Sequence, residues 1–213
     1  MRDIPVFTTS NGAASLRLRE VPYKGVAFIT LQDTLNPAEL LQECIDFCKV
    51  VGASRIYATG HDFLMNYPLY TAVWQMRRTR EGLRQTDAAL FPVTEKTVEK
   101  WRTIYNERMA DVPNASIMTR DDGEKLLKTG NGYFIHRNGE LLGIGSALGD
   151  AVETVIAVKP EAGEDVLLAL CSALFSDSIV LEVASANIPA VKLYNRLGFV
   201  KTAERSRWYT VSK

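Results

Sequence analysis

Residues 181–204 read LEVASANIPAVKLYNRLGFVKTAE, and their pattern changes from strand to helix and back to strand. The segment 179–184 (IVLEVA) is rich in β-branched residues, which is typical of a buried strand. Pro189 stands where the first turn of a helix favours proline, and apolar residues then recur at helical spacing up to Leu197. Two short strands are expected over 199–204 and 207–212. The stretch therefore predicts a strand, a loop and a helix, followed by a closing hairpin.

Upstream of this stretch, the pattern predicts a mixed α/β layer. Successive strands are expected over 132–136, 141–148 and 151–158, with Asn138-Gly139 as the hairpin turn between the first two. A helix over 164–175 (EDVLLALCSALF) follows. Before the meander we expect a strand over 89–93, an amphipathic helix carrying Val98, Trp101, Tyr105 and Met109, and a short helix capped by Thr119 with Asp122 three residues on. The fold class is α/β, or α+β, because the meander precedes a strand that must run parallel to its last member.

The N-terminal part predicts a β-β-α-β-α order. Strands are expected over 15–20, 25–31 and 55–59, a helix from Asn36-Pro37 to Gly52, and a second helix over 68–80. The charged segment 77–87 is poor in apolar residues and predicts a boundary, which gives an N-terminal segment over 1–86 and a domain over 87–213. The helix–strand–loop–helix order of both parts indicates either an internal repeat or the ordinary likeness of any two βαβα stretches.

Composition excludes several classes of function. The 213 residues hold 25 Lys and Arg against 25 Asp and Glu, so no net charge attracts nucleic acid or an anionic membrane. The first residues lack a signal-peptide pattern and no apolar run approaches the roughly 20 residues of a membrane span, which predicts a cytoplasmic protein. Cys44, Cys48 and Cys171 show no disulfide or zinc spacing, and His61 and His136 lie in no metal motif. We expect no bound metal.

The 181–204 stretch also carries a motif. Its strand ends in V-x-x-x-N, and A-x-x-L-Y-x-x-x-G-F follows, with the matched residues Val183, Asn187, Ala190, Leu193, Tyr194, Gly198 and Phe199. This pattern resembles the signature of the GNAT superfamily of N-acetyltransferases, and with the preceding VIAVKP the resemblance spans roughly Leu90 to the C-terminus. It implies a mixed central sheet whose splayed parallel strands are flanked by helices, the acyl-CoA N-acyltransferase fold. It also implies transfer of an acetyl group from acetyl-CoA to a small-molecule or peptide amine by direct attack.

The resemblance assigns roles to individual residues. The strand ending at Val158 and the strand ending near Ala184 would part, and their free main-chain groups would hold the pantetheine amides. Tyr194 would donate a proton to the departing thiolate; alternatively it is a core aromatic of an amphipathic helix. The cofactor-binding residues expected on this basis are Ile156, Ala157, Val158, Ala162, Gly163, Glu164, Asn187, Ala190 and Tyr194.

An acceptor amine must lose a proton, so a base is expected near the meander strand that flanks the thioester. Glu153 is the only carboxylate within that strand. In several families of the superfamily, a glutamate on the equivalent strand serves as the base, directly or through water. The alternative is a solvent-facing strand residue. Tyr133 and His136 are weaker possibilities, and a surface position for His136 is the simpler interpretation.

One segment departs from the superfamily pattern. The loop that normally reads Q/R-x-x-G-x-G/A and binds pyrophosphate is here KPEAGED, with one glycine and the acids Glu161, Glu164 and Asp165. These acids would repel phosphate, and Lys159 offsets one charge at most. Two hypotheses follow, an active transferase and a non-catalytic module of the same fold that binds or regulates. Tyr194 favours the first and the acidic loop favours the second.

Other questions stay open at this point. Other acyl donors, including aminoacyl-tRNA used by tandem copies of the fold, are a third possibility, which the neutral charge balance disfavours.

The N-terminal segment resembles a partial copy of the fold without counterparts of Asn187 and Tyr194, and a structural role suits it best. Active-site roles for its His61, Asp62, Tyr67 and Tyr70 are less expected than core or surface positions. The acceptor and the choice between monomer and homodimer are not determined by the sequence.

Overall fold

The computed structural model describes residues 5–212, and the chain forms two compact units. The first unit contains the residues up to Val73 together with those from Glu204 onward, and the second contains Trp74–Ala203. This division differs from the expected one after residue 86. The reason is that two long strands, β5 (Leu69–Thr79) and β11 (Val200–Ser212), each begin in one unit and end in the other. The charged segment 80–88 is a connection within the second unit.

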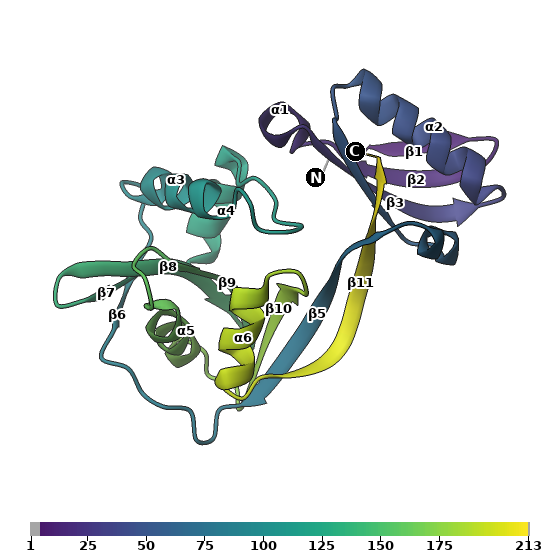
Figure 1. Cartoon of the computed structure of the whole chain (residues 1–213). Coiled ribbons are helices and arrows are strands. Elements are labelled where there is room, and N and C mark those ends of the chain that lie inside the picture. The colour runs from purple at the N-terminus through teal and green to yellow at the C-terminus, as the bar shows by residue number, and fades with distance from the viewer. Residues whose placement is uncertain (1–4, 213) are drawn as a thin grey trace. The chain divides into compact units, whose positions relative to one another are not determined.

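The first unit combines a sheet with one long helix. Its elements are β1 (Val6–Thr9), β2 (Gly12–Arg17), α1 (Val21–Lys24), β3 (Val26–Thr34), α2 (Pro37–Val50), β4 (Arg55–Thr59) and a 3₁₀ turn (Asp62–Asn66). The strand order is β1-β2-β3-β4-β11, with β3 and β4 parallel and the other pairs antiparallel. The side chain of Asn36 caps α2 by accepting the Glu39 N–H, as expected. Buried apolar side chains of α2 pack on β2 and β3 (Figure 1).

Two thiols in the core of the first unit predict a loss of stability in alkaline solution. Burial raises the pKa of Cys44 to about 12 and that of Cys48 to about 11, from an ordinary value of 9.0. Because the folded state holds these protons more tightly, their contribution is complete below pH 9. It is lost as the pH rises from 9 to about 11 for Cys48 and from 9 to about 12 for Cys44. We expect the free energy of unfolding to fall there by about 1.4 kcal/mol per pH unit for each thiol.

Urea unfolding of the wild type and of a Cys44→Ala, Cys48→Ala variant measures this slope. The variant starts less stable at pH 7, since two cavities replace the sulfurs. Its free energy of unfolding should nevertheless fall less steeply above pH 9. Equal slopes in both proteins would show that the two thiols do not cause the loss.

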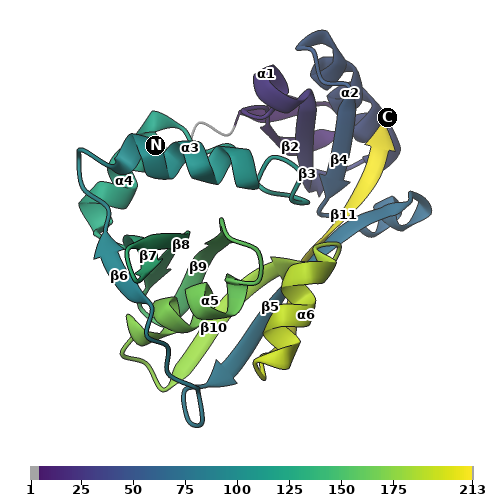
Figure 2. The same cartoon turned by 60° about the vertical axis from the view of Figure 1, so that its left-hand side comes forward.

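The second unit is a curled sheet covered on both faces. Its elements are β6 (Ala89–Pro92), α3 (Val98–Arg108), α4 (Arg120–Thr129), β7 (Gly132–Arg137), β8 (Glu140–Leu148), β9 (Ala151–Ala157), α5 (Gly163–Ser172), β10 (Ser178–Ala184) and α6 (Ile188–Arg196). The strand order is β11-β5-β10-β9-β8-β7-β6. Helices α5 and α6 cover one face and α3 and α4 the other (Figures 1 and 2). Each face has its own apolar core, the larger one under α5 and α6.

Helix α5 lies directly on β8 because two positions of that strand are glycine. A Cβ at Gly143 would stand 2.6 Å from a methyl carbon of Val166, and one at Gly145 would stand 2.4 Å from a methyl carbon of Leu170. Both distances are too short for any larger residue without movement of the helix. The two glycines therefore allow α5 to pack closely on β8.

Most elements expected in the second unit are confirmed. The meander β7-β8-β9 has Asn138 and Gly139 at its first turn with φ of 52° and 82°, and the capping box of Thr119 and Asp122 begins α4. Helices α3, α5 and α6 and strands β6 and β10 lie where the pattern placed them.

Two expectations are wrong. The helix predicted over 68–80 is strand β5, whose aromatic and β-branched residues Tyr70, Val73 and Trp74 suit a strand, and which β10 and β11 flank. The closing hairpin is the single strand β11. Because β5 is a strand, the helix–strand–loop–helix order is not shared by the two halves. None of the helices in the described part of the chain has both the length and the apolarity of a membrane span.

Candidate functional site

Strands β9 and β10 run parallel but separate soon after they start. Among residues 5–212 they pair at two positions only, Ala151 with Val180 and Val152 with Leu181. The N–H of Val180 also donates to the carbonyl of Asp150 at 2.9 Å. Beyond these pairs, β9 continues to Ala157 and β10 to Ala184 without partnering each other. The expected parting of these strands is therefore present.

The side of β9 that faces this gap presents main-chain groups without a strand partner. On its other side, β9 pairs with β8, and the N–H of Val158 donates to the Leu142 carbonyl at 2.9 Å. Since N–H groups alternate in direction along a strand, those of Ala157 and Val155 point away from β8. An extended ligand in the gap could bond to them as a further strand would. The sequence analysis named Ala157 but missed Val155, which the two-residue period of a strand would have found.

Helix α5 begins at Gly163, after the short connection that follows this strand, and its first N–H groups lack a side-chain cap. Its N-cap residue is Ala162, whereas α2, α4 and α6 are capped by Asn36, Thr119 and Asn187. An uncapped helix start is a favourable place for an anion because its N–H groups point outward. Gly163 also permits a close approach of α6, since a Cβ there would lie 3.2 Å from a methyl carbon of Leu193.

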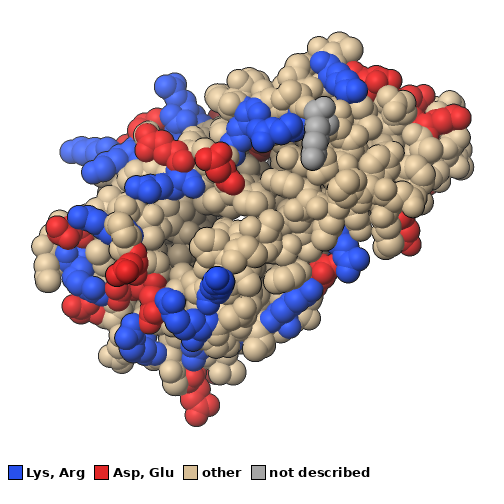
Figure 3. Space-filling view, viewed as in Figure 1, with Lys and Arg blue, Asp and Glu red and all other residues tan. Residues whose placement is uncertain are grey.

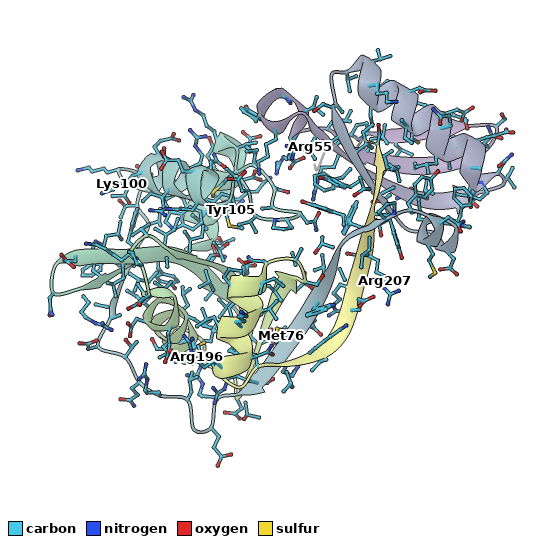
Figure 4. The ribbon with its side chains drawn as sticks, in the orientation of Figure 1. Arg55, Met76, Lys100, Tyr105, Arg196 and Arg207 are labelled. Atoms are coloured by element: carbon cyan, nitrogen blue, oxygen red, sulfur yellow. The ribbon has the colours of Figure 1, made fainter. Side chains whose placement is uncertain are left out.

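Two of the three acids expected to repel phosphate, Glu164 and Asp165, are paired with arginines, which corrects that expectation for these two but not for Glu161. Glu164 lies 2.5 Å from Arg84 and 3.1 Å from Arg196, and Asp165 lies 2.5 Å from Arg137. Arg137 also contacts Asp87 at 2.6 Å, so three arginines face three carboxylates. Lys159 pairs instead with Glu140. The arginines come from distant segments, and Arg196 is at the end of α6 (Figure 4).

This arginine cluster offsets the negative charges of Glu164 and Asp165. Arg84 and Arg196 are exposed, so their pairs with Glu164 are weak in water and open to rearrangement, whereas Arg137 and Asp165 are partly buried. The carboxylates of Asp165 and Asp87 raise the pKa of Arg137, which keeps it charged. Basic and acidic side chains are likewise interspersed over the side of the second unit seen in Figure 3.

Glu153 is the extra residue of a β-bulge. Ser146 of β8 lies opposite Thr154, while the next residue, Ala147, lies opposite Val152, so Glu153 has no counterpart. It directly follows Val152, the last residue of β9 that pairs with β10. The bulge therefore places Glu153 at the point where the strands part, and the residue is exposed there, as the alternative of a solvent-facing strand residue expects. Its Oε2 accepts a hydrogen bond from Nδ2 of Asn131 at 2.8 Å.

A cavity of about 410 Å³ lies beside Glu153. It is lined by residues at the starts of β9 and β10 and by part of β5, namely Gln75, Arg77, Asp150, Ala151, Val152, Glu153, Val180, Leu181 and Glu182. Three carboxylates and one guanidinium share the lining with the apolar side chains of Ala151, Val152, Val180 and Leu181. Within the described residues, no group of three or more His, Cys, Asp and Glu side chains is arranged to hold a metal ion.

Tyr194 lies on α6 and is buried, with 7% of its surface exposed, beside Phe199 in the core under α5 and α6. Burial, with a smaller contribution from the neighbouring Cys171, raises its pKa to about 12. The phenol is thus protonated at any physiological pH. Met76 of β5, labelled in Figure 4, belongs to the same core. The geometry is compatible with both interpretations of Tyr194, the general acid and the core aromatic.

The other expected cofactor residues have mixed positions. Asn187 accepts the Ala190 N–H at 3.4 Å and so serves as the cap of α6. Ile156 is buried in the core under α3 and α4. The main chain of Val158 is already engaged, since its N–H bonds to Leu142 and its carbonyl accepts from Arg108 at 3.2 Å. Ala162 is buried in the core under α5.

The weaker base candidates lie apart from Glu153. His136 pairs with Leu141 at the hairpin end of the meander, whereas Glu153 is near the opposite end of β9. His136 is half-buried, with its ring edge-on to Phe91 at 5.1 Å between centroids, which differs from the expected surface position. Tyr133 packs toward the core under α5.

The first unit contains no comparable gap among its described residues. Its parallel strands β3 and β4 stay paired over five positions, from Val26 with Arg55 to Thr30 with Thr59. His61 and Asp62 are exposed and line a shallow cavity of about 380 Å³ within this unit. Tyr70 stacks on Tyr57 and Tyr67 lies edge-on to Phe63.

Comparison with known proteins gives the fold. No protein-family profile and no curated sequence matches the chain, but many solved structures do. A GNAT-family acetyltransferase from Colwellia psychrerythraea matches at 14% identity over 96% of this chain and 84% of its own, with a TM-score of 0.52. The chain has the GNAT fold. A functionally unknown conserved protein from Staphylococcus epidermidis matches at 12% identity over 98% of this chain and 93% of its own, with a TM-score of 0.60.

A third match is a tandem GNAT protein from the clavulanic acid biosynthesis pathway, at 12% identity over 97% of this chain and 81% of its own, with a TM-score of 0.51. These three structures are similar to both compact units, because each match covers nearly the whole chain. The similarity therefore extends beyond the residues that carry the sequence motif.

Proposed function

We propose that the protein is an acyl-CoA-dependent N-acyltransferase that moves an acetyl group from acetyl-CoA to a small-molecule or peptide amine. The observation that carries this proposal is the parting of β9 and β10 in front of the uncapped start of α5. The gap offers N–H groups for the pantetheine amides, and the helix start offers N–H groups for the pyrophosphate. The two sets of N–H groups belong to one chain segment, residues 155–165.

The proposed chemistry is a direct transfer. The amine nitrogen attacks the thioester carbonyl, a C–N bond forms and the C–S bond breaks. Glu153, at the apex of the gap, takes a proton from the nitrogen, and Tyr194 gives one to the thiolate. Glu153 then releases its proton to bulk water and Tyr194 regains one from it, which returns both groups to their starting protonation states.

The arginine cluster supports phosphate binding despite the acidic loop. Arg84, Arg137 and Arg196 meet at the start of α5. The pairs that the exposed Arg84 and Arg196 make with Glu164 are weak enough to yield to a phosphate. This weakens the main argument for a non-catalytic module, which was an unneutralised acidic loop. The first unit, which keeps β3 and β4 paired, is assigned a structural role within this proposal.

The proposal is tested by thiol release from acetyl-CoA in the presence of three acceptors: spermidine, lysine ethyl ester and a trialanine peptide. The expected result is amine-dependent release of CoA and a mass increase of the acceptor. Tight CoA binding without transfer to any acceptor would favour the non-catalytic module. Absence of both would contradict the proposal.

Replacing one main-chain donor in the gap should weaken CoA binding. Ala157→Pro removes an N–H that faces the gap, while the ladder with β8 keeps its hydrogen bonds. We expect CoA to bind roughly 10-fold more weakly in isothermal titration, which is the contribution of one hydrogen bond. Ala157→Ser retains the N–H and is the matched control. Equal affinity of the two variants would place the ligand elsewhere.

A further inference from the structure

We propose that Asn131 is a positioning residue that holds the Glu153 carboxylate ready to accept the proton of the attacking amine. The inference rests on the proposed function, because it gives Glu153 the part of the base. It concerns a residue that no sequence motif marks. Three observations carry it: the anchoring of Asn131, the fixed orientation of its amide, and the bulge at Glu153.

Asn131 is anchored between α4 and β7. Gly130, with a left-handed φ of 64°, ends α4 by donating its N–H to the carbonyls of Leu126 and Leu127. The next residue, Asn131, accepts the Ala147 N–H at 3.0 Å with its main-chain carbonyl, which extends the β7-β8 ladder by one position. Its side chain is 6% exposed. The backbone of Asn131 is therefore fixed against β8, the strand that lies between β7 and β9.

The amide of Asn131 has one orientation that satisfies its neighbours. A carboxylate can only accept hydrogen bonds, so Nδ2 must face Oε2 of Glu153, at 2.8 Å. The amide oxygen then faces the hydroxyl of Thr129, whose single proton it shares with the carbonyls of Lys125 and Leu126. Thr129, Asn131 and Glu153 thus form a directed chain from the end of α4 to the apex of the gap.

The bulge makes such a hold necessary. Glu153 has no opposite residue on β8, so the ladder does not restrain it as it restrains Val152 and Thr154. One carboxylate oxygen is occupied by Asn131, which leaves Oε1 free to accept a proton. Misplacement of a catalytic group by about 1 Å can cost roughly 100-fold in rate. Asn131 would supply this alignment without touching the substrate.

A double-mutant cycle tests the inference, with acetyl-CoA and whichever of the three acceptors named above is acetylated. Asn131→Ala should lower kcat by about 10- to 100-fold with little change in the KM for acetyl-CoA. In a Glu153→Gln background the same change should lower kcat less than about 2-fold, because the group it positions is gone. Thr129→Val should lower kcat in the same direction, and Thr129→Ser, which keeps the hydroxyl, should restore it.

Asn106→Ala is the matched control. The Asn106 side chain bonds the main chain of Met118 through both its amide groups, which is a structural role. This variant should lose stability and leave kcat unchanged. If Asn131→Ala does not fold, the exposed Thr129 variants decide alone. Additive losses in the cycle, or an unchanged kcat in Asn131→Ala or in Thr129→Val, would overturn the inference while the proposed function stands. A wild type without acetyl transfer would overturn both.

Discussion

Tyr194→Phe is expected to lower kcat for acetyl transfer by roughly 100-fold or more, the usual contribution of a positioned general acid. The substitution removes one oxygen from a buried ring and keeps the packing against Phe199. Acetyl-CoA should bind as in the wild type, so the KM for acetyl-CoA changes little. Steady-state kinetics at pH 7 measures both quantities.

Tyr57→Phe is the control for this prediction. Tyr57 is also 7% exposed, but it lies in the first unit, stacked on Tyr70. The same chemical change there should leave kcat unaltered. A Tyr194→Phe protein as active as the wild type would show that the residue is a core aromatic only, and another group would have to protonate the thiolate.

Arg80→Met is expected to lower the free energy of unfolding by about 2–4 kcal/mol. Arg80 follows β5, and its guanidinium donates to the carbonyls of Cys171, Leu174 and Ser176, at and just beyond the end of α5. Removal takes away the Arg80 partner of the Leu174 and Ser176 carbonyls, whereas the Cys171 carbonyl still accepts the Leu174 N–H. These carbonyls lie just beyond the end of a helix whose other end faces the gap. Urea unfolding at pH 7 measures the change, and the denaturant slope should stay the same.

Arg77→Met provides the comparison within the same segment. Arg77 is exposed and its side chain donates to the hydroxyl of Ser178 at 2.9 Å. Its replacement should change stability by no more than about 0.5 kcal/mol. Equal losses in the two variants would mean that the carbonyls at the end of α5 find other partners, and that Arg80 is not their cap.

The second unit could largely be predicted from the sequence because its signals are local. The Asn138-Gly139 turn, the Thr119 capping box and the proline after Asn187 each determine an element through neighbouring residues. Strand β5 could not be predicted in this way. Its apolar residues fit a helical spacing equally well, and the strands that flank it are distant in the chain.

The site follows the same division. The motif around Tyr194 was visible in the sequence, and so was Glu153, the single carboxylate of the last meander strand. The pairing of Glu164 and Asp165 with arginines 80, 32 and 28 positions away was not, since no local pattern relates these positions. Asn131 likewise has no signal beyond the helix-ending glycine before it. Tertiary contacts determine both features, and they change the interpretation of the acidic loop.

The central claim is that CoA binds between β9 and β10 and at the start of α5. The most direct test is to add CoA to ¹⁵N-labelled protein and to follow the backbone amide signals. We predict that the signals of Val155, Ala157 and Gly163–Asp165 shift together and saturate, because their N–H groups gain hydrogen bonds. Signals of this segment that stay unchanged while CoA is added, or shifts confined to the rest of the chain, would contradict the account.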